Sequence, residues 1–185
     1  MIITAESIPG YVAGTWKIDP SHSEVGFTVR HLAISKVRGA FEHFDATVHA
    51  AENPLESSVE VTVDVKSINT NNADRDKHLR GNDFFAPDEF PTMTFLSTGV
   101  RVEGDAMLVD GELTLRGVTK PITLTGKFGG IAKDPWGATK AAANGTVVIN
   151  RHDFGVSWNT PLEAGGFMLG NEVTITIDAQ FSLQA

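Results

Sequence analysis

The sequence of 185 residues contains no cysteine, which excludes disulfide bonds, thiolate nucleophiles and thiolate metal sites. It also has no run that approaches the roughly 20 apolar residues of a membrane-spanning helix. The N-terminal segment MIITAESIPGYVAG lacks the basic start and the apolar core of a signal peptide. We therefore expect a soluble, cytoplasmic protein without stable membrane insertion, and a periplasmic or secreted one only if a signal has been removed.

Basic residues are scarce, because 15 Lys and Arg stand against 23 Asp and Glu and give a formal net charge of −8. Nucleic acids and anionic membranes bind basic surfaces, so this charge argues against both as partners. The hydrophobic fraction of 41% is that of a globular chain. The length and the absence of a composition break favour a single domain over residues 1–185, with its core in residues 15–183.

Motifs of nucleophilic catalysis and phosphate binding are missing as well. No Gly-x-Ser-x-Gly elbow occurs, and the glycine-rich segment around Trp136 lacks the Gly-Lys-Ser/Thr ending of a phosphate loop. Ser21 and His22 are neighbours in sequence, but adjacent strand residues point to opposite faces, so we expect their side chains not to meet. Asp88 and Glu89 are typical of solvated surface. We therefore predict no catalytic residue.

Six histidines raise the question of a metal site, yet none forms a His-x-x-x-His pair. Asp74 and His78 are four residues apart on an expected helix and are the best local pair of ligands. The alternative for this pair is an exposed ion pair or a capping interaction. Because the spacing motifs of zinc sites are missing, we expect no metal and no required cofactor beyond a bound lipid-like ligand.

What the sequence has in abundance is alternation of apolar and polar residues, which is typical of strands with one buried face. Strongly alternating segments cover residues 23–31, 57–67, 106–117, 121–130 and 171–183. Further strands are expected at residues 15–19, 37–48, 93–97, 100–103 and 145–150, and a long loop at residues 129–145.

About eight to ten strands without helices between them predict an all-β, antiparallel fold. The inward positions lack the buried Trp and Cys pair of immunoglobulin-like sandwiches, and a closed barrel leaves no exposed edge. We therefore predict an extended antiparallel β-barrel of about eight strands, lipocalin-like, with one or two short helices near its mouth. A barrel of this size has room for one small ligand.

One stretch, NADRDKHLRGNDFFAPDEFP at residues 72–91, departs from the alternation. Asn71 or Asn72 is a suitable N-cap and Gly81 suits the position after the last turn, which predicts a short helix over residues 72–80. A helix that is polar on nearly all sides cannot be held by burial of its own face. We expect the phenylalanines that follow it to hold it as a lid over the barrel rim.

Phenylalanine is the abundant aromatic residue, with eleven copies against one tyrosine. Phenylalanine offers apolar area without a polar group, so a surplus favours an apolar ligand channel. The alternative is that each ring belongs to an ordinary core.

Several segments resemble the YceI-like family of polyisoprenoid-binding, lipocalin-resembling proteins. They are WKIDPSHSEVGFTVRHL, VRGAFEHF, NTNNADRDKHLRGNDFFAPDEFPTMTF, VDGELTLRGVTKPITL and NRHDFGVSWNTPLEAGGFMLGNEVTITID, in this order along residues 16–178. The resemblance implies a tunnel for an amphiphile with an isoprenoid or acyl tail, such as a polyprenyl quinone. Many members of the family are exported, whereas no export signal is visible here.

The matching positions and the strand alternation together predict the residues that meet such a ligand. The expected apolar wall consists of Phe27, Val29, Phe41, Phe44, Phe84, Phe85, Phe95, Leu113, Leu115 and Trp158. The expected polar contacts at the mouth are His31, His78 and Arg80, for which an ordinary surface role is the alternative.

These observations favour a non-enzymatic binding protein that holds a hydrophobic, long-tailed small molecule for transport, storage or sequestration. One alternative is an enzyme that acts on an isoprenoid-type substrate, with His31 or His78 as acid or base. Another is a stress-related protein whose barrel is only a scaffold for partners. A homodimer is possible through an open barrel edge.

Overall fold

The computed structural model describes residues 2–185. Its strands are β1 (Gly14–Ile18), β2 (Glu24–His31), β3 (Ser35–Phe41), β4 (Phe44–Ala50), β5 (Ser58–Asp64), β6 (Ile68–Asn69), β7 (Thr92–Glu103), β8 (Ala106–Leu115), β9 (Val118–Lys133), β10 (Thr139–Asn150) and β11 (Leu169–Leu183). The α-helix is α1 (Ala73–Leu79), and the 3-10 helices are η1 (Ala5–Ser7), η2 (Pro20–His22), η3 (Pro54–Glu56), η4 (Val65–Ser67) and η5 (Arg151–Phe154).

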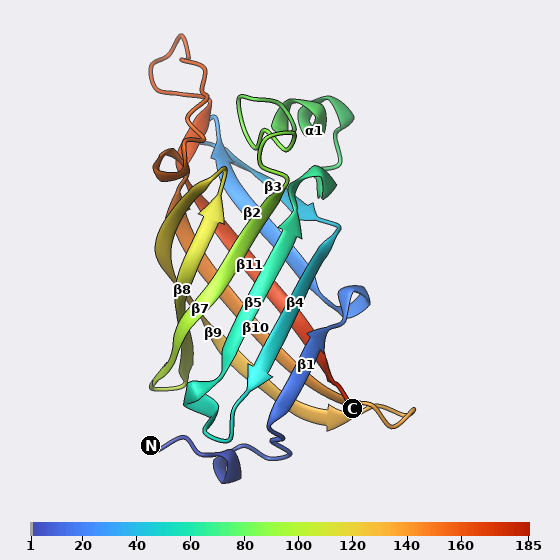
Figure 1. Ribbon diagram of the computed structural model, residues 1–185. Helices are drawn as coiled ribbons and strands as arrows, with labels where there is room; N and C mark the ends of the chain where they lie inside the picture. Colours follow the sequence, from blue (N-terminus) through green and yellow to red (C-terminus); the bar gives the residue numbers. More distant parts are fainter. Residues whose placement is uncertain (1) are drawn as a thin grey trace.

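Eight strands close into a barrel in the order β1-β4-β5-β7-β8-β9-β10-β11, with β11 returning to β1 (Figure 1). β11 pairs with β10 along one edge, and its other edge pairs with two strands in succession. Residues 181–183 pair with β1 and residues 169–178 with β2, from which β3 and β6 continue. All of these pairings are antiparallel, so the predicted antiparallel barrel of about eight strands is confirmed.

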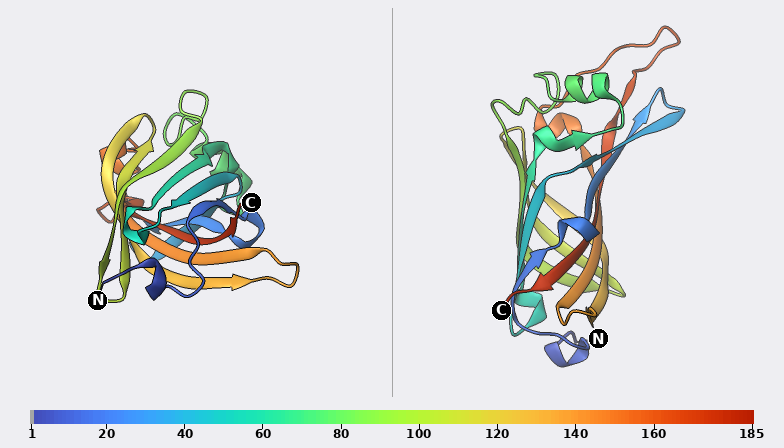
Figure 2. Two further views of the ribbon diagram at one scale, coloured as in Figure 1. Left: turned by 60° about the horizontal axis from the view of Figure 1, so that its bottom comes forward. Right: turned by 90° about the vertical axis from the view of Figure 1, so that its right-hand side faces the viewer.

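The barrel is elongated, with α1 at one end and the C-terminus and first described residues near the other (Figures 1 and 2). We call these the helix end and the terminal end. No helix within residues 2–185 is long and apolar enough to cross a membrane.

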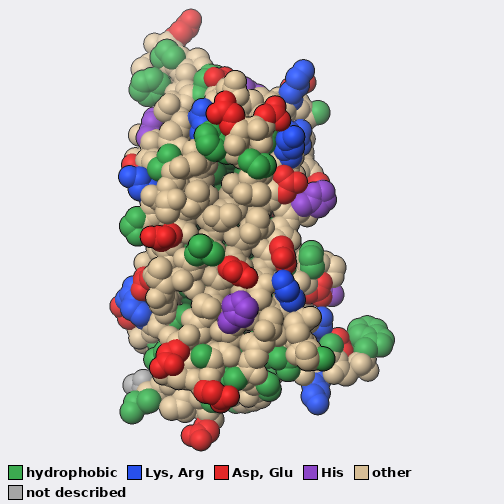
Figure 3. Space-filling model, viewed as in Figure 1, with side chains coloured by type: hydrophobic (Ala, Val, Ile, Leu, Met, Phe, Trp, Pro, Cys, Tyr) green, Lys and Arg blue, Asp and Glu red, His purple; other side chains and the backbone are tan. Residues whose placement is uncertain are grey.

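The strand register places apolar residues of neighbouring strands side by side within the barrel. On β2 and β11, Val25 lies opposite Ile177, Phe27 opposite Ile175, and Val29 opposite Val173. Charged side chains of both signs are scattered over the outer wall (Figure 3). The alternation in the sequence thus separates an apolar interior from a polar exterior.

Two inward-facing glycines leave room for aromatic rings. Gly39 of β3 pairs with Phe27 of β2, and a side chain at Gly39 would collide with that ring. A Cβ added to Gly111 of β8 would lie 2.5 Å from Cζ of Phe95. Both rings therefore lie across a neighbouring strand that offers no side chain at that point.

Two strand predictions were wrong in extent. Residues 37–48 form two strands instead of one, because the chain leaves the sheet after Phe41 to bind η4. There Glu42 N–H donates to the carbonyl of Ser67, and His43 N–H donates to its Oγ at 3.0 Å. The two short segments expected at residues 93–97 and 100–103 form the single strand β7, with a bulge between Ser97 and Gly99.

The long loop predicted at residues 129–145 is also wrong, since most of this segment extends β9 and β10 into a hairpin. The turn itself is short. Asp134 Oδ1 accepts the N–H groups of Trp136 and Ala138, both at 2.9 Å. This carboxylate stabilises the short turn. The many glycines and alanines around it had suggested a long loop instead.

The predicted helix is present over Ala73–Leu79, and Asn72 is its N-cap, accepting the N–H of Arg75 at 3.0 Å. Its attachment is more polar than expected. Asp76 is buried, and its Oδ1 accepts both the N–H and the hydroxyl of Thr70, at 2.9 and 2.6 Å. Buried, charge-assisted hydrogen bonds of this kind are strong, so they hold α1 together with the phenylalanines that follow.

Candidate functional site

The barrel contains two cavities, each of them partly open to solvent. The upper cavity, at the helix end, has a volume of about 180 Å³, and the lower cavity, at the terminal end, has a volume of about 440 Å³. No residue within 2–185 lines both. The interior of the barrel is therefore incompletely filled by its own side chains, in contrast to an ordinary close-packed core.

A packed layer, which we call the divider, separates the cavities. Val63 and Leu113 are only 2% and 4% exposed and line neither cavity. Phe41 borders the upper cavity and Phe95 the lower one, while Phe44 packs against the buried cores on both sides. The sequence predicted one continuous tunnel. In this structure the tunnel is divided, because apolar side chains from five strands fill the middle of the barrel.

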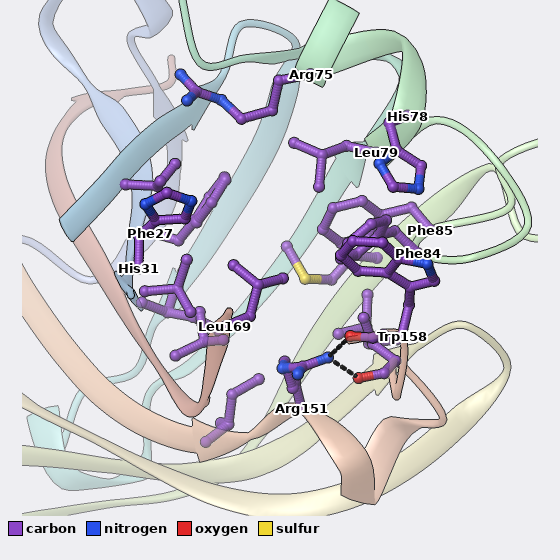
Figure 4. Close-up of a pocket in the computed structure, with 18 of the residues that line it drawn as sticks. Phe27, His31, Arg75, His78, Leu79, Phe84, Phe85, Arg151, Trp158 and Leu169 are labelled. Atoms are coloured by element: carbon purple, nitrogen blue, oxygen red, sulfur yellow. Dashed lines mark hydrogen bonds between the residues drawn. The ribbon is translucent and has the colours of Figure 1, made fainter. Parts of the chain in front are cut away.

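Aromatic side chains form much of the upper cavity's wall (Figure 4). The ring of Phe41 lies between those of Phe27 and Phe85, with centroid distances of 5.9 and 5.7 Å. The Phe41–Phe85 pair has the edge-to-face arrangement that aromatic rings favour. Since Phe27 comes from β2 and Phe85 from the segment after α1, this contact joins the lid to the barrel wall.

A second aromatic group lies beneath α1. The ring of His78 meets those of Phe84 and Trp158 edge to face, at centroid distances of 5.0 and 4.7 Å. His78 Nε2 also lies 2.9 Å from Asp83 Oδ2, on the side away from the cavity lining. The imidazole therefore packs against two aromatic rings, and Asp83, which does not line the cavity, fixes its Nε2.

Arg151 is the most buried charged residue of the upper cavity's lining, with 4% of its surface exposed. Its Nε donates to the carbonyl of Gly170 at 2.8 Å. Its Nη1 donates to the carbonyls of Val156 and Trp158, each at 2.8 Å (Figure 4). Its Nη2 is buried and has no hydrogen-bond partner among the described residues. Burial lowers the pKa of this guanidinium from its usual value.

The lower cavity is almost entirely apolar. Its walls come mainly from strands of the closed ring, among them small residues such as Ala46 and Ala143 that leave the space open. At the terminal end it is bordered by the segment before β1, including Ile8 and Tyr11. The Tyr11 hydroxyl donates to the carbonyl of Ala51 at 2.7 Å and fastens this segment across the opening.

A sequence model of the YceI-like domain matches residues 16–181, which is nearly the whole chain. The chain belongs to the YceI-like family. It is 43% identical to Protein YceI of Salmonella newport over 149 residues, which are 79% of this chain and 78% of that protein.

Solved structures show the same fold. BcnA of Burkholderia cenocepacia superposes with a TM-score of 0.74 at 23% identity, covering 88% of this chain and 98% of that one. A domain of Saccharophagus degradans described as polyisoprenoid-binding and implicated in plant cell wall breakdown superposes with a TM-score of 0.66 at 16% identity. That alignment covers 91% of this chain and 98% of the domain. The predicted lipocalin-like architecture is thus that of YceI-like proteins.

In this YceI-like barrel, most of the residues predicted to meet a ligand lie around the upper cavity. They are Phe27, Val29, His31, Phe41, His78, Phe84, Phe85, Leu115 and Trp158. Phe95 borders the lower cavity, whereas Phe44 and Leu113 belong to the divider.

Arg80 does not line either cavity, although we predicted it at the mouth. As the C-cap of α1 it turns back toward the sheet, where its Nε and Nη2 donate to the carbonyls of Lys66 and Ile68 at 2.8 and 2.9 Å. The sequence analysis missed Arg151 and the segment before β1. The available signal for Arg151 was a long basic side chain directly after an apolar strand.

The expectation that Ser21 and His22 do not meet was wrong, because they lie in η2 and not in a strand. Ser21 Oγ is 3.1 Å from His22 Nδ1, and the Asp19 carboxylate lies 2.7 Å from the hydroxyl and 2.8 Å from Nδ1. A catalytic relay uses the two different ring nitrogens for the acid and the hydroxyl. Here the same nitrogen, His22 Nδ1, contacts both the Ser21 hydroxyl and the Asp19 carboxylate, and the three residues lie outside both cavities. We therefore interpret them as a cap of η2.

Within residues 2–185, no three His, Asp or Glu side chains are arranged to hold a metal ion. His78, half of the best pair in the sequence, points to Asp83 as described above.

Proposed function

We propose that this YceI-like protein is a non-enzymatic binding protein that holds a hydrophobic, long-tailed small molecule inside its barrel, for transport, storage or sequestration. The observation that carries the proposal is the pair of apolar cavities within one closed wall. A protein interior that leaves such volumes unfilled loses the contacts that close packing provides. A guest chain that occupies the space restores those contacts.

The energetics favour a ligand with a long apolar tail. Each methylene transferred from water to an apolar site contributes about 0.8 kcal/mol. A tail of about ten carbons therefore gains about 8 kcal/mol before the cost of ordering it. The lower cavity suits such a tail, since its lining consists mainly of aliphatic and aromatic side chains of the barrel strands.

The upper cavity suits the less apolar end of the same ligand, because polar side chains border it. His31, Arg75 and His78 lie around the space shown in Figure 4. A molecule that occupies both cavities has to displace divider side chains such as Phe41 and Phe95. We propose an isoprenoid, a polyprenyl quinone or a fatty-acyl amphiphile as the class of ligand. The Saccharophagus degradans domain supports this choice, as it shares the fold and is described as polyisoprenoid-binding.

Native mass spectrometry of the gently purified protein tests the proposal. We expect a co-purified lipid mass that is lost on organic extraction and regained when the extract is added back. Incubation of the extract with the protein should leave the lipid's mass unchanged. A bare protein that regains nothing, or conversion of the lipid into a product, would contradict the proposal.

A matched pair of variants on β5 locates the site. Val61 lines the lower cavity, while Thr62 beside it is exposed on the outer wall. Val61→Glu places a charge against the tail and should abolish lipid retention, since burying an unpaired charge is costly. Thr62→Glu adds the same charge outside and should retain the lipid. Circular dichroism of both variants verifies that the barrel is folded. Equal retention by the two would place the ligand elsewhere.

A further inference from the structure

Arg151 has hydrogen-bond donors without partners, and these bear on which head group the proposed ligand carries. Three of the five guanidinium N–H donors are used by the carbonyls of Gly170, Val156 and Trp158. The two donors on Nη2 have no partner among residues 2–185, although the atom is shielded from solvent. Unpartnered donors on a buried charged group are rare in folded proteins.

The charge of Arg151 is uncompensated as well. None of the ion pairs in the described part of the chain includes it. Among residues 2–185, the other ionisable side chains that line the upper cavity are Arg75, His31 and His78, and none of them is an Asp or a Glu. Asp83, which pairs with His78, stands outside this lining. Although the chain has a net charge of −8, the ionisable side chains described in this lining are all arginines or histidines.

Burying a cation without a counter-charge is unfavourable, and arginine cannot avoid the cost by losing its proton at physiological pH. Part of the cost is offset by the three backbone carbonyls. The remainder is offset when an acceptor oxygen, above all an anionic one, approaches Nη2. Guanidinium groups are well suited to this because they bind carboxylate and phosphate oxygens with strong, directed hydrogen bonds.

We infer that the ligand of the upper cavity carries an acidic head group, a carboxylate or a phosphate, which pairs with Nη2 of Arg151. This rests on the proposed function and narrows it, since a neutral quinone or alcohol offers no counter-charge. The head group lies at the helix end beside Arg151, and the apolar tail extends from it along the lining formed by residues such as Ile149 and Ile175.

The test compares ligands that differ only in the head group. Hexadecanoic acid is compared with hexadecanol, and farnesyl phosphate with farnesol, each titrated into delipidated protein. The acidic member of at least one pair should bind about tenfold or more tightly than its alcohol. Whichever acid shows the larger ratio identifies carboxylate or phosphate as the preferred group.

The three tryptophans report where the ligand binds. Trp158 lines the upper cavity, Trp16 lines the lower cavity, and Trp136 is 89% exposed in the β9–β10 turn. In protein labelled with fluorotryptophan, we expect the acid and the alcohol to shift the Trp158 fluorine resonance differently. The Trp136 resonance should not move with either. A response confined to Trp16 would overturn the placement of the head group.

Arg151→Gln removes the charge and should reduce acid binding about tenfold while alcohol binding changes little. Arg116→Gln is the matched control, because Arg116 also donates to two backbone carbonyls, those of Gly155 and Asn82, but lines neither cavity. It should keep the acid preference of the unaltered protein. An acid preference that persists in Arg151→Gln would overturn the role of Arg151.

The unaltered protein decides the question even if Arg151→Gln does not fold. A tenfold acid preference together with a distinct Trp158 shift supports the inference. Equal affinity for acid and alcohol overturns it, because the ligand's acidic group then gains nothing from Nη2, while the proposed binding function stands. If no member of either pair binds, the proposed function fails and the inference fails with it.

Discussion

The two cavities lie in one barrel, yet they differ in how their walls are built. The lower cavity is lined mainly by strands of the closed ring, and the segment before β1 borders it at the terminal end. The upper cavity is bordered in addition by α1, by the segment after it and by η5, which contribute His78, Phe84 and Arg151. The strands supply most of the apolar wall of both cavities, whereas α1 and η5 bring the charged Arg75 and Arg151 to the upper cavity alone.

This difference bears on specificity. An apolar wall gains free energy in proportion to the area that it covers and distinguishes poorly among tails. Polar groups that are fixed by other contacts recognise a head group by position and charge. For the ligand proposed above, the comparison predicts that the lower cavity selects tail length and the upper cavity selects head-group chemistry. Three experiments test it, beginning with the largest expected effect.

The divider is tested by Phe41→Ala. Removing this buried ring should lower the free energy of unfolding by about 3–5 kcal/mol and join the two cavities. Phe167→Ala, at a residue 61% exposed, is the control and should change stability by no more than about 0.5 kcal/mol. Chemical denaturation of the delipidated variants measures both. A loss below about 1 kcal/mol at Phe41 would show that the divider is loosely packed.

The role of the lower cavity is tested by Ala143→Phe, which fills it from β10. A ligand with a hexadecyl tail should lose about 2–3 kcal/mol of binding free energy, the contribution of three or four methylenes. The octyl version of the same ligand should bind as before. Val148→Phe, on the outer face of β10, is the control for the added ring. Titration calorimetry decides, and equal losses for both tails would contradict the assignment of tail length.

The smallest effect concerns Asp19, near the β1–β11 seam that closes the wall of the lower cavity. Its N–H donates to Gln180 of β11, and hydrogen bonds from the Ser21 hydroxyl, and then His22, hold the pKa of its carboxyl well below its usual range. A lowered pKa contributes stability that is present above about pH 4 and is lost as the pH falls through the folded value. Asp19→Asn should cost about 0.5–1.5 kcal/mol at pH 7 and less at pH 3.

Denaturation curves at both pH values measure this effect. Asp45→Asn is the control, because the carboxyl of Asp45 lies 3.7 Å from Lys17 and is 69% exposed. The loss of stability caused by Asp45→Asn should be negligible, as is usual for exposed ion pairs. An equal loss for Asp19→Asn at pH 7 and pH 3 would show that the carboxylate's charge does not contribute.

The sequence predicted those parts of the molecule that follow from local pattern. Alternation located most strands and the inward positions, and the capping residue Asn72 located α1. The sequence could not show that Phe41, Phe44 and Phe95 meet at the divider. Their spacing in the sequence does not reveal how far along the barrel axis each side chain lies. The sequence also could not show the environment of Arg151. Three carbonyls from two separate segments surround that guanidinium, and only the folded chain brings them together.

The short pairing between β3 and β6 has a mechanical consequence. Only Ala40 with Asn69 and Phe41 with Ile68 connect these strands, whereas β2 is joined to β11 over a much longer register. We therefore expect a force that widens the helix end to separate β3 from β6 before it disturbs the eight-stranded ring. In such an opening the β2–β3 hairpin would turn about its pairing with β11, and the strands of the ring would keep their partners.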